Sequence, residues 1–283
     1  SLTELIQIHS NPIYRIHFFG FLPGFFYLNG LSPLLHTPRK SVPMIAVPPG
    51  SVAIGGNQTG IYPMQSPGGW HIIGRSPLAF FDSKQPIPVW AKAGELGIPV
   101  LIHAADPAQF WQAMDSTNER WLELKLHPNR RRSATDPAPF EQIIAEQHRV
   151  FAKHPKTTFI NAHMGWMAND LDAAGAHLDQ YPNVNYEIGA IIAELGRQPR
   201  RAKEFFTKYQ DRILFGKDAY NKEEFYTYFR VLETEDEYFP YYKKYHAFWS
   251  MYGLGLSDEV LKKVYYKNAL RIVPRLDKTL FPD

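Results

Sequence analysis

The stretch IPVLIH at residues 98–103 decides the fold, because it is a continuous apolar run that ends in a polar side chain. Two further stretches repeat this pattern, TFINAH at residues 158–163 and ILFGKD at residues 213–218. Continuous apolar runs are typical of strands that are buried on both faces of a parallel sheet. The carboxyl ends of parallel strands meet at one rim, so we expect the polar residues that close these runs to share a site.

Helical patterns separate these runs. We expect a fourth strand at residues 184–188, and helices at residues 90–96, 139–153, 171–181, 199–209, 223–234, 241–252 and 257–270. Alternating strands and helices predict βα units around a parallel sheet. A closed barrel of this kind needs eight strands. The sequence therefore predicts an α/β fold in which residues 85–283 form a partial (β/α)8 TIM-barrel-like part of about four βα units.

The first part of the chain has a different pattern. Short apolar runs at residues 14–21, 52–54, 71–73 and 78–81 are separated by turns rich in Gly and Pro. Short strands between such turns predict a small all-β segment at residues 1–84. Only residues 2–8 could form a helical turn there.

Composition excludes several classes of function. The chain has no cysteine, so disulfide scaffolds and thiolate sites are excluded, and a metal would need imidazole and carboxylate ligands. A net charge of +3 over 283 residues gives no basis for nucleic-acid binding. No apolar run reaches the length of a membrane span, and no signal-peptide pattern opens the sequence. We expect a cytoplasmic protein that binds neither nucleic acid nor membranes.

Several motifs follow one another in the second part: IPVLIH at 98–103, NERW at 118–121, NAHMG at 161–165, ELGRQP at 194–199 and DRILFG at 211–216, with Asp218 after it. Through them residues 86–283 resemble the C-terminal half of the amidohydrolase-related family of metal-dependent hydrolases. The resemblance implies hydrolysis, or decarboxylation in some relatives, of a small acid or amide.

The resemblance also implies roles for single residues. His103, His163 and Asp218 would bind a divalent metal, zinc or alternatively manganese. His163 would also polarise the substrate, and Asp218 would take the proton from the attacking water. Arg197, Glu187 and Lys217 are candidates for substrate binding.

The chain departs from the family pattern at three points. The family's opening strand carries a His-x-His pair, and no two of the eleven histidines here have that spacing. Lys217 stands where the family usually has Thr, which places a cation beside the expected metal. Ile191 stands where relatives often have Arg. These departures predict impaired metal binding.

The first part carries the motifs GFLPGFFYL at 20–28, VPPGSVAI at 47–54 and SPGGW at 66–70. Residues 1–83 resemble the C-terminal, cyclophilin-like lobe of the allophanate hydrolase subunit 1 family, which includes the 5-oxoprolinase B subunit and the Kip inhibitor. That resemblance implies work with a partner subunit in ATP-dependent amide or lactam hydrolysis, or inhibition of a kinase.

The chain therefore resembles a fusion or chimera with its seam near residues 82–86. A four-stranded parallel sheet has two open edges, which we expect the strands of residues 14–81, a second copy or a partner subunit to cover. Three functions stay open. They are a metal-dependent hydrolase, a binding or regulatory module acting through residues 1–83, and an engineered or recombined chimera without native activity.

Overall fold

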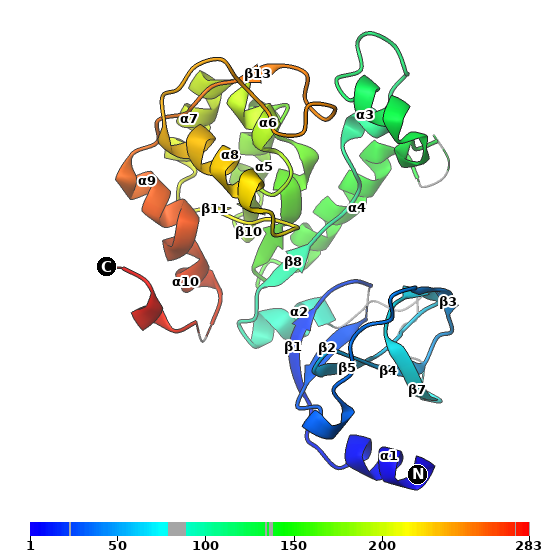
Figure 1. Cartoon of the computed structure of the whole chain (residues 1–283). Helices are drawn as coiled ribbons and strands as arrows, with labels where there is room; N and C mark the ends of the chain where they lie inside the picture. The colour runs from blue at the N-terminus through cyan, green and yellow to red at the C-terminus, as the bar shows by residue number, and fades with distance from the viewer. Residues whose placement is uncertain (23, 79–88, 134, 136–137, 275, 283) are drawn as a thin grey trace. The chain divides into compact units, whose positions relative to one another are not determined.

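The computed structural model describes residues 1–22, 24–78, 89–133, 135, 138–274 and 276–282 (Figure 1). The chain divides into two compact units, unit 1 at Ser1–Lys92 and unit 2 at Ala93–Asp283. The expected seam at residues 82–86 and the end of the expected strand at 78–81 lie outside the described residues.

Unit 1 is a set of antiparallel strands preceded by one helix. Helix α1 (Leu2–Ser10) begins at a capping box in which Ser1 and Glu4 satisfy each other's backbone N–H groups. The strands are β1 (Arg15–Phe19), β2 (Phe26–Asn29), β3 (Met44–Val47), β4 (Ser51–Gly55), β5 (Gln58–Ile61), β6 (Ser66–Gly68) and β7 (His71–Arg75). One sheet has the order β1-β2-β5-β4-β7, and β3 pairs with β6. The expected β-strands are therefore present and pair antiparallel, and the nine-residue helix is longer than the helical turn expected at residues 2–8.

Aromatic side chains form the core of unit 1. The buried cluster consists of Phe25, Val47, Ala53, Tyr62 and Trp70. A Cβ atom on Gly55 would lie 2.5 Å from the Trp70 ring, and one on Gly60 would lie 2.9 Å from the Phe25 ring. These two strand glycines are needed because aromatic rings approach the backbone there.

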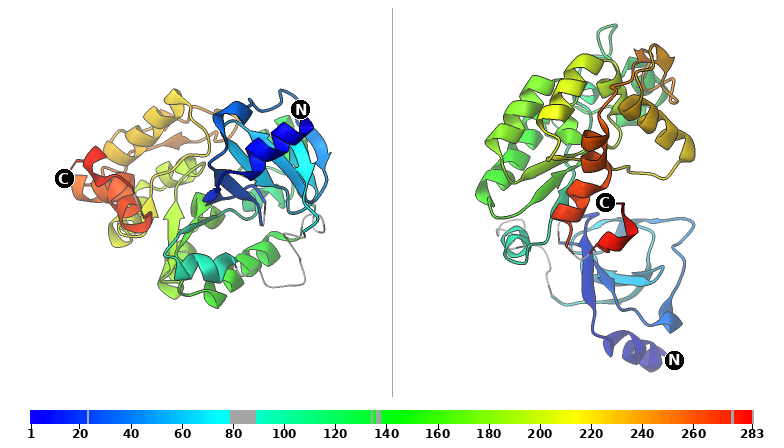
Figure 2. Two further views of the ribbon diagram at one scale, coloured as in Figure 1. Left: turned by 90° about the horizontal axis from the view of Figure 1, so that it is seen from below. Right: turned by 90° about the vertical axis from the view of Figure 1, so that its left-hand side faces the viewer.

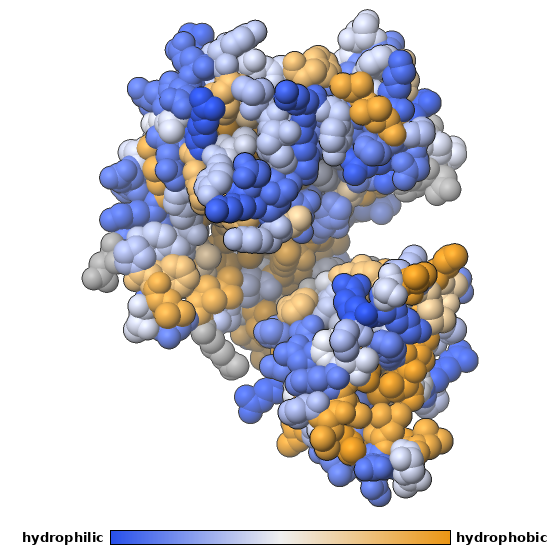
Figure 3. All heavy atoms as spheres, viewed as in Figure 1, coloured by the Kyte–Doolittle hydropathy of each residue, from blue (hydrophilic) through white to orange (hydrophobic). Residues whose placement is uncertain are grey.

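Unit 1 also exposes many large apolar side chains. Ile13 and Ile45 are each 89% exposed, Leu34 is 80% exposed and Val42 is 77% exposed. Figure 3 shows apolar residues gathered on the visible face of this unit. Contiguous apolar surface of this kind marks interaction sites in soluble proteins.

Unit 2 contains the parallel sheet expected from the apolar runs. Its strands are β8 (Val100–Ile102), β9 (Phe159–Asn161), β10 (Val184–Glu187) and β11 (Ile213–Leu214), in the order β11-β10-β9-β8. All three pairings are parallel, with Phe159 opposite both Val100 and Val184. The four expected strands are confirmed, each shorter than the apolar run that predicted it.

Helices pack on this sheet (Figure 2). The helices of unit 2 include the end of α2 (Val89–Glu95), and then α3 (Trp121–Leu126), α4 (Phe140–Lys153), α5 (Leu171–Gln180), α6 (Ile192–Gly196), α7 (Pro199–Lys208), α8 (Lys222–Glu233), α9 (Asp258–Lys262) and α10 (Asn268–Ile272). Phe151 of α4, Leu178 of α5 and Phe206 of α7 are at most 1% exposed, as are Phe159 and Val184 of the sheet. The amphipathic faces of these helices therefore supply the core over the strands.

The C-terminal helical segment covers the outer side of β11. Asn268 donates its amide hydrogens to the carbonyls of Gln210 and Ile213, at 2.7 and 2.8 Å. Phe215 donates its backbone N–H to the carbonyl of Val264 at 2.8 Å. A π-helical turn, Lys263–Lys267, lies between α9 and α10. One edge of the sheet is thus capped from within unit 2.

One expectation from the sequence is wrong, and one stays a prediction. Residues 241–252 form no helix; they run as turns between the paired strands β12 (Phe239–Pro240) and β13 (Ser250–Met251). The described strands of residues 14–78 belong to sheets of their own, and β8 ends the parallel sheet without a further strand in the described part of the chain. Closure of that edge by a second copy or a partner subunit stays a prediction.

Among the helices of the described residues, none has both the length and the apolar character that a membrane crossing requires.

A buried histidine in unit 2 is expected to make its stability depend on pH. His177 is 4% exposed, its Nδ1 lies 2.7 Å from the Tyr186 hydroxyl, and its ring lies tilted against the His148 ring with centroids 4.3 Å apart. Burial, followed by the charges of His148 and Arg212, lowers the pKa of His177 to about 3. In the unfolded chain this imidazole titrates near the ordinary value of 6.5. The unfolded state therefore binds more protons between these two values, and stability falls as the pH falls through that window.

We expect unit 2 to lose about 2–3 kcal/mol of unfolding free energy between pH 7 and pH 4.5 through this residue. Urea unfolding followed at both pH values measures the loss. His177→Gln should flatten the pH dependence by a similar amount. An equal slope in the parent and the variant would contradict the assignment.

Candidate functional site

The polar residues that close the apolar runs meet at the carboxyl ends of neighbouring strands. His103 follows β8, His163 follows β9 and Asp218 follows β11, while Glu187 ends β10. The imidazole rings of His103 and His163 lie edge to face with centroids 5.0 Å apart. Asp218 is exposed and lies near enough for its charge to act on both imidazoles. These residues therefore lie together at one rim.

Backbone strain is concentrated at the same rim. Ala105 after β8, His163, Met164 and Trp166 after β9, and Ala190 after β10 all have φ between 51° and 61°. Non-glycine residues in this left-handed region carry a steric cost, and such residues cluster at functional sites. The strain supports assigning this rim as the candidate site.

The hydrogen bonds of His163 determine which ring nitrogen carries its proton. Nδ1 lies 2.7 Å from the Gly189 carbonyl oxygen, which can only accept, so Nδ1 holds the hydrogen in the neutral ring. The Nε2 atom then has a free lone pair. Burial lowers the pKa of His163, and the Gly189 hydrogen bond and the Asp218 charge oppose that effect. The neutral form, with a basic Nε2, is therefore favoured at neutral pH.

His103 is more open to solvent than His163. Partial desolvation of its ring is the main effect that lowers the pKa of His103, even though the residue as a whole is exposed. The charge of the His163 imidazole is the second effect and acts in the same direction. Trp166 lies against both rings, with centroids 4.5 Å from His163 and 6.1 Å from His103. Trp166 therefore limits the directions from which a ligand can reach the two imidazoles.

Lys217 does not carry a free charge into the site. Its ammonium group contacts the Glu224 carboxylate and lies 4.5 Å above the Tyr228 ring, and its side chain is 4% exposed. Lys243 also pairs with Glu224, at 3.0 Å. Burial alone would raise the pKa of Glu224, but hydrogen bonds from Lys217, Lys243 and Tyr242 lower it. The lysine beside Asp218 is thus neutralised by a glutamate of α8.

A cavity of about 300 Å³ opens beside Asp218. Its walls come from the loops after β8, β9, β10 and β11 and from the turns after β12. Charged and aromatic side chains line it, including Asp106, Arg132, Trp166, Asp218, Tyr242 and His246. Arg132 donates two hydrogen bonds to Asp106, at 2.7 and 2.9 Å. The cavity is large enough for a small polar molecule next to the candidate site.

Arg197 is not brought to this cavity. Its guanidinium group contacts Glu119 and lies 4.9 Å from the Trp249 ring. It lines a different pocket, together with Glu235 and Tyr252. The proposed substrate-binding role of Arg197 therefore has no support from its position.

The divalent metal that the resemblance implies does not fit the described donors. Among the described residues, no three histidine, cysteine, aspartate or glutamate side chains form a group that could hold a metal ion. His163 and His103 supply two imidazoles, but the Glu187 carboxylate is turned to backbone N–H groups of His163 and Gly189. The rim is therefore better suited to proton transfer by these side chains than to metal binding.

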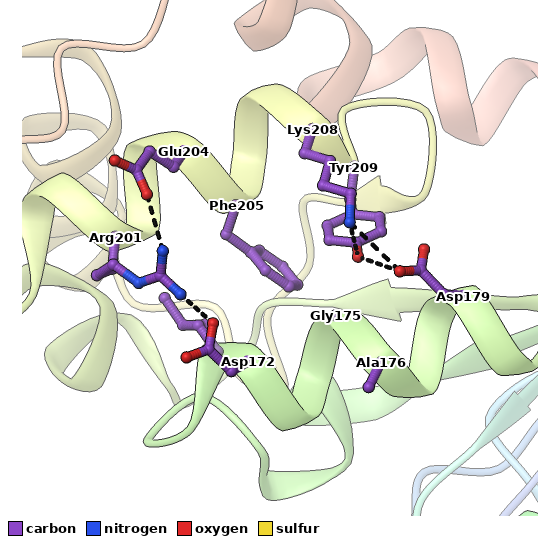
Figure 4. Close-up of a pocket in the computed structure, with 10 residues that line it drawn as sticks. Asp172, Gly175, Ala176, Asp179, Arg201, Glu204, Phe205, Lys208 and Tyr209 are labelled. Atoms are coloured by element: carbon purple, nitrogen blue, oxygen red, sulfur yellow. Dashed lines mark hydrogen bonds and ion pairs between the residues drawn. The ribbon is translucent and has the colours of Figure 1, made fainter.

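Another pocket, of about 400 Å³, lies between helices α5 and α7 (Figure 4). Its charged side chains are paired: Arg201 contacts Asp172 and Glu204, and Lys208 lies 3.3 Å from Asp179. Gly175 allows the close approach, since a Cβ atom there would lie 2.9 Å from the Tyr209 hydroxyl. This groove belongs to helix packing, and none of the strained residues of the rim is among those that line it.

Comparison with known families identifies both parts of the chain. Residues 68–275 match the sequence model of the family described as Amidohydrolase. The chain belongs to the amidohydrolase family. Residues 1–91 match the model described as Carboxyltransferase domain, subdomain C and D, so the chain has a two-part architecture.

Curated relatives match about a third of the chain. The chain is 54% identical to the 5-oxoprolinase B subunit of Haemophilus influenzae over 92 residues, which is 32% of this chain and 43% of the relative. It is 46% identical to the 5-oxoprolinase B subunit of Escherichia coli O157:H7 over 95 residues, which is 34% of this chain and 44% of the relative. The chain thus spans less than half the length of these relatives.

Two solved structures are similar to about two thirds of the chain. An uncharacterized TIM-barrel protein from Bordetella bronchiseptica is 18% identical, with a TM-score of 0.37, covering 68% of this chain and 50% of that chain. The 2,6-dihydroxybenzoate decarboxylase from Rhizobium is 17% identical, with a TM-score of 0.36, covering 68% of this chain and 58% of that chain.

Sequence reasoning missed much of the cavity wall of the amidohydrolase part. The segment that contains Tyr242 and His246 has a helical pattern, and it instead forms turns against the cavity. Trp166 directly follows the NAHMG motif, and Asp106 follows IPVLIH at a distance of three residues. Their position after strand ends was a usable signal, whereas nothing local marked the residues after β12.

Proposed function

We propose that the amidohydrolase part is a hydrolase or decarboxylase for a small acid or amide, with its active site at the rim formed by the loops after β8 to β11. The observation that carries the proposal is the orientation of His163, whose Nδ1 faces the Gly189 carbonyl at 2.7 Å and leaves Nε2 as a base. The adjoining cavity of about 300 Å³ would hold the substrate beside Asp218.

In this proposal His163 is the general base. Its Nε2 takes a proton from a water molecule, and the hydroxide attacks the substrate carbonyl. The proton then passes to the leaving group, so that the imidazole returns to its neutral form. Asp218 stabilises the transient imidazolium, since its negative charge favours the protonated ring. No step is assigned to zinc or manganese, because the described donors do not fit a metal.

Turnover by the purified chain tests the proposal. The assay uses a panel of small aromatic and cyclic carboxylic acids and amides, and it measures release of carbon dioxide, ammonia or a new carboxylate. We expect turnover of at least one compound without added metal. If no compound is turned over, with or without zinc and manganese, the proposal is contradicted. The better explanation is then that the chain is a chimera without native activity.

The surface of unit 1 favours a second function, binding of another protein chain. Ile13 and Ile45 are each 89% exposed, and the curated relatives are named as subunits of an enzyme. Light scattering should give a molar mass above the 32.6 kDa of one chain, and Ile45→Asp should lower it. A mass of one chain for both proteins would contradict self-association through this surface.

A further inference from the structure

The turn that carries His163 is left-handed over four consecutive residues. The φ angles of His163, Met164, Gly165 and Trp166 are 56°, 51°, 60° and 61°. A left-handed conformation costs an L-residue about 1–2 kcal/mol, and only Gly165 escapes that cost. Surrounding groups must therefore hold this turn in place.

Two amide side chains pack against the turn. Gln147 of α4 and Asn161 of β9 exchange two hydrogen bonds, at 3.0 and 3.1 Å, and both side chains are buried. A Cβ atom on Gly165 would lie 2.6 Å from the Asn161 amide nitrogen, so the pair fills the space under the turn. Met164 is fully buried beside them. Packing against this pair therefore holds the backbone on this side.

Glu187 holds the turn from the neighbouring strand. Its Oε2 accepts the backbone N–H of His163 at 3.1 Å, and its Oε1 accepts the backbone N–H of Gly189. The carbonyl of the same Gly189 accepts the Nδ1–H of the His163 ring at 2.7 Å. The three hydrogen bonds tie both the backbone and the ring of His163 to the end of β10.

Two glycines leave room for the Glu187 carboxylate. A Cβ atom on Gly189 would lie 2.6 Å from Oε1, and a Cβ atom on Gly216 would also collide with the carboxylate. The side chain of Glu187 is 14% exposed, and its carboxylate lies 3.8 Å from the His163 ring nitrogen. Burial raises the pKa of Glu187, so its charge is kept at a cost to stability. A costly carboxylate that uses both oxygens on backbone N–H groups suits positioning better than substrate binding.

We propose that Glu187 is a positioning residue that locks the left-handed turn and keeps the His163 ring in its Nδ1–H form, which leaves the lone pair on Nε2. Gly189 and Gly216 make this lock possible. Glu187 therefore does not bind substrate, which changes the role expected for it from the sequence. Only the use of the Nε2 lone pair as a base rests on the proposed function; the lock itself does not.

Nitrogen-15 spectra of the histidine rings test the lock without any substrate. The chain is labelled in its histidines, and the His163 signals are assigned as those missing from His163→Gln. We expect the neutral His163 ring to be protonated at Nδ1. In Glu187→Gln the amide has one accepting oxygen for two backbone N–H groups, so the population protonated at Nε2 should rise about fivefold, the effect of one lost hydrogen bond.

Gly216→Ala is an independent test, because the Glu187 carboxylate remains in the chain but the added Cβ atom pushes it out of its position. The same shift toward the Nε2–H form is expected. Gly175→Ala is the matched control: its Cβ atom would meet the Tyr209 hydroxyl at 2.9 Å in the packing of α5, and the His163 signals should not change. Circular dichroism melts establish that each variant is folded.

An unchanged Nδ1–H ring in folded Glu187→Gln would overturn the proposal. If Gly216→Ala does not fold, Glu187→Gln decides the matter, since it is nearly the same size and shape as the parent. A confirmed lock together with no turnover of the substrate panel would reject the proposed function and leave the positioning role standing.

Discussion

Arg120→Met lowers the free energy of unfolding of unit 2 by about 3–5 kcal/mol, because it removes the arginine that pairs with the buried Glu194 and leaves the buried Glu123 with the half-exposed Arg130. The side chain of Arg120 is 1% exposed. It contacts Glu123 at 3.0 Å and Glu194 at 2.5 Å, and those side chains are 1% and 7% exposed. Removing one member of a buried ion network costs more than the network contributes, since the remaining charges cannot be solvated.

Urea unfolding followed by tryptophan fluorescence measures this effect. Arg130→Met is the matched control, because Arg130 also pairs with Glu123 but its side chain is 44% exposed. We expect the control to cost about 1 kcal/mol or less, as for ion pairs near the surface. Adding Glu194→Gln to Arg120→Met should recover part of the loss. Similar costs for the two arginine variants would show that burial does not set the strength of this network.

His163→Gln lowers kcat/KM by about 10²–10⁴-fold on any substrate that the panel identifies, the usual effect of removing a general base. Glutamine has no nitrogen lone pair that can accept a proton at neutral pH. Burial lowers the pKa of His163, so the basic form is present in the parent at neutral pH. Steady-state rates at a fixed pH measure the loss, and kcat should carry most of it, because the proton transfer occurs after substrate binding.

His154→Gln is the control for this variant, because His154 caps α4 and precedes β9 at the opposite end of the strand from His163. Its rates should stay within about twofold of the parent, since it lies outside the rim. A His163→Gln chain that keeps a third or more of the parent rate would remove His163 from the proposed mechanism. Bound metal in the parent that disappears in the variant would favour the metal-dependent alternative.

Local sequence patterns determined most of the secondary structure of unit 2 and the positions of three candidate site residues. Four apolar runs became β8 to β11, since continuous apolar residues are stable only when both faces of a strand are covered. Parallel pairing then places the carboxyl ends of these strands at one rim. That topology brings His103, His163 and Asp218 together, although they are far apart in the chain. The resemblances to the amidohydrolase-related family and to the allophanate hydrolase subunit 1 family also depended on local motifs.

Contacts between distant segments decided the chemistry of the rim. Residues 241–252 have a helical pattern, yet packing as turns between β12 and β13 brings Tyr242, Lys243 and His246 to the cavity. Lys217 is neutralised by Glu224 of α8, and Arg197 is held by Glu119. No pattern within a few residues encodes such pairings, because their energy depends on burial and on which charges meet in space.

The left-handed turn at His163 shows most clearly what local sequence determines and what tertiary contacts determine. The motif that carries the histidine placed it after a strand and left its orientation open. Only the folded chain supplies the amide pair of Gln147 with Asn161 and the carboxylate of Glu187 that offset the strain of the turn. Short-range sequence thus determined which side chain reaches the rim. Tertiary hydrogen bonds decided which of its ring nitrogen atoms carries the hydrogen, and strained backbone persists only where surrounding groups hold it.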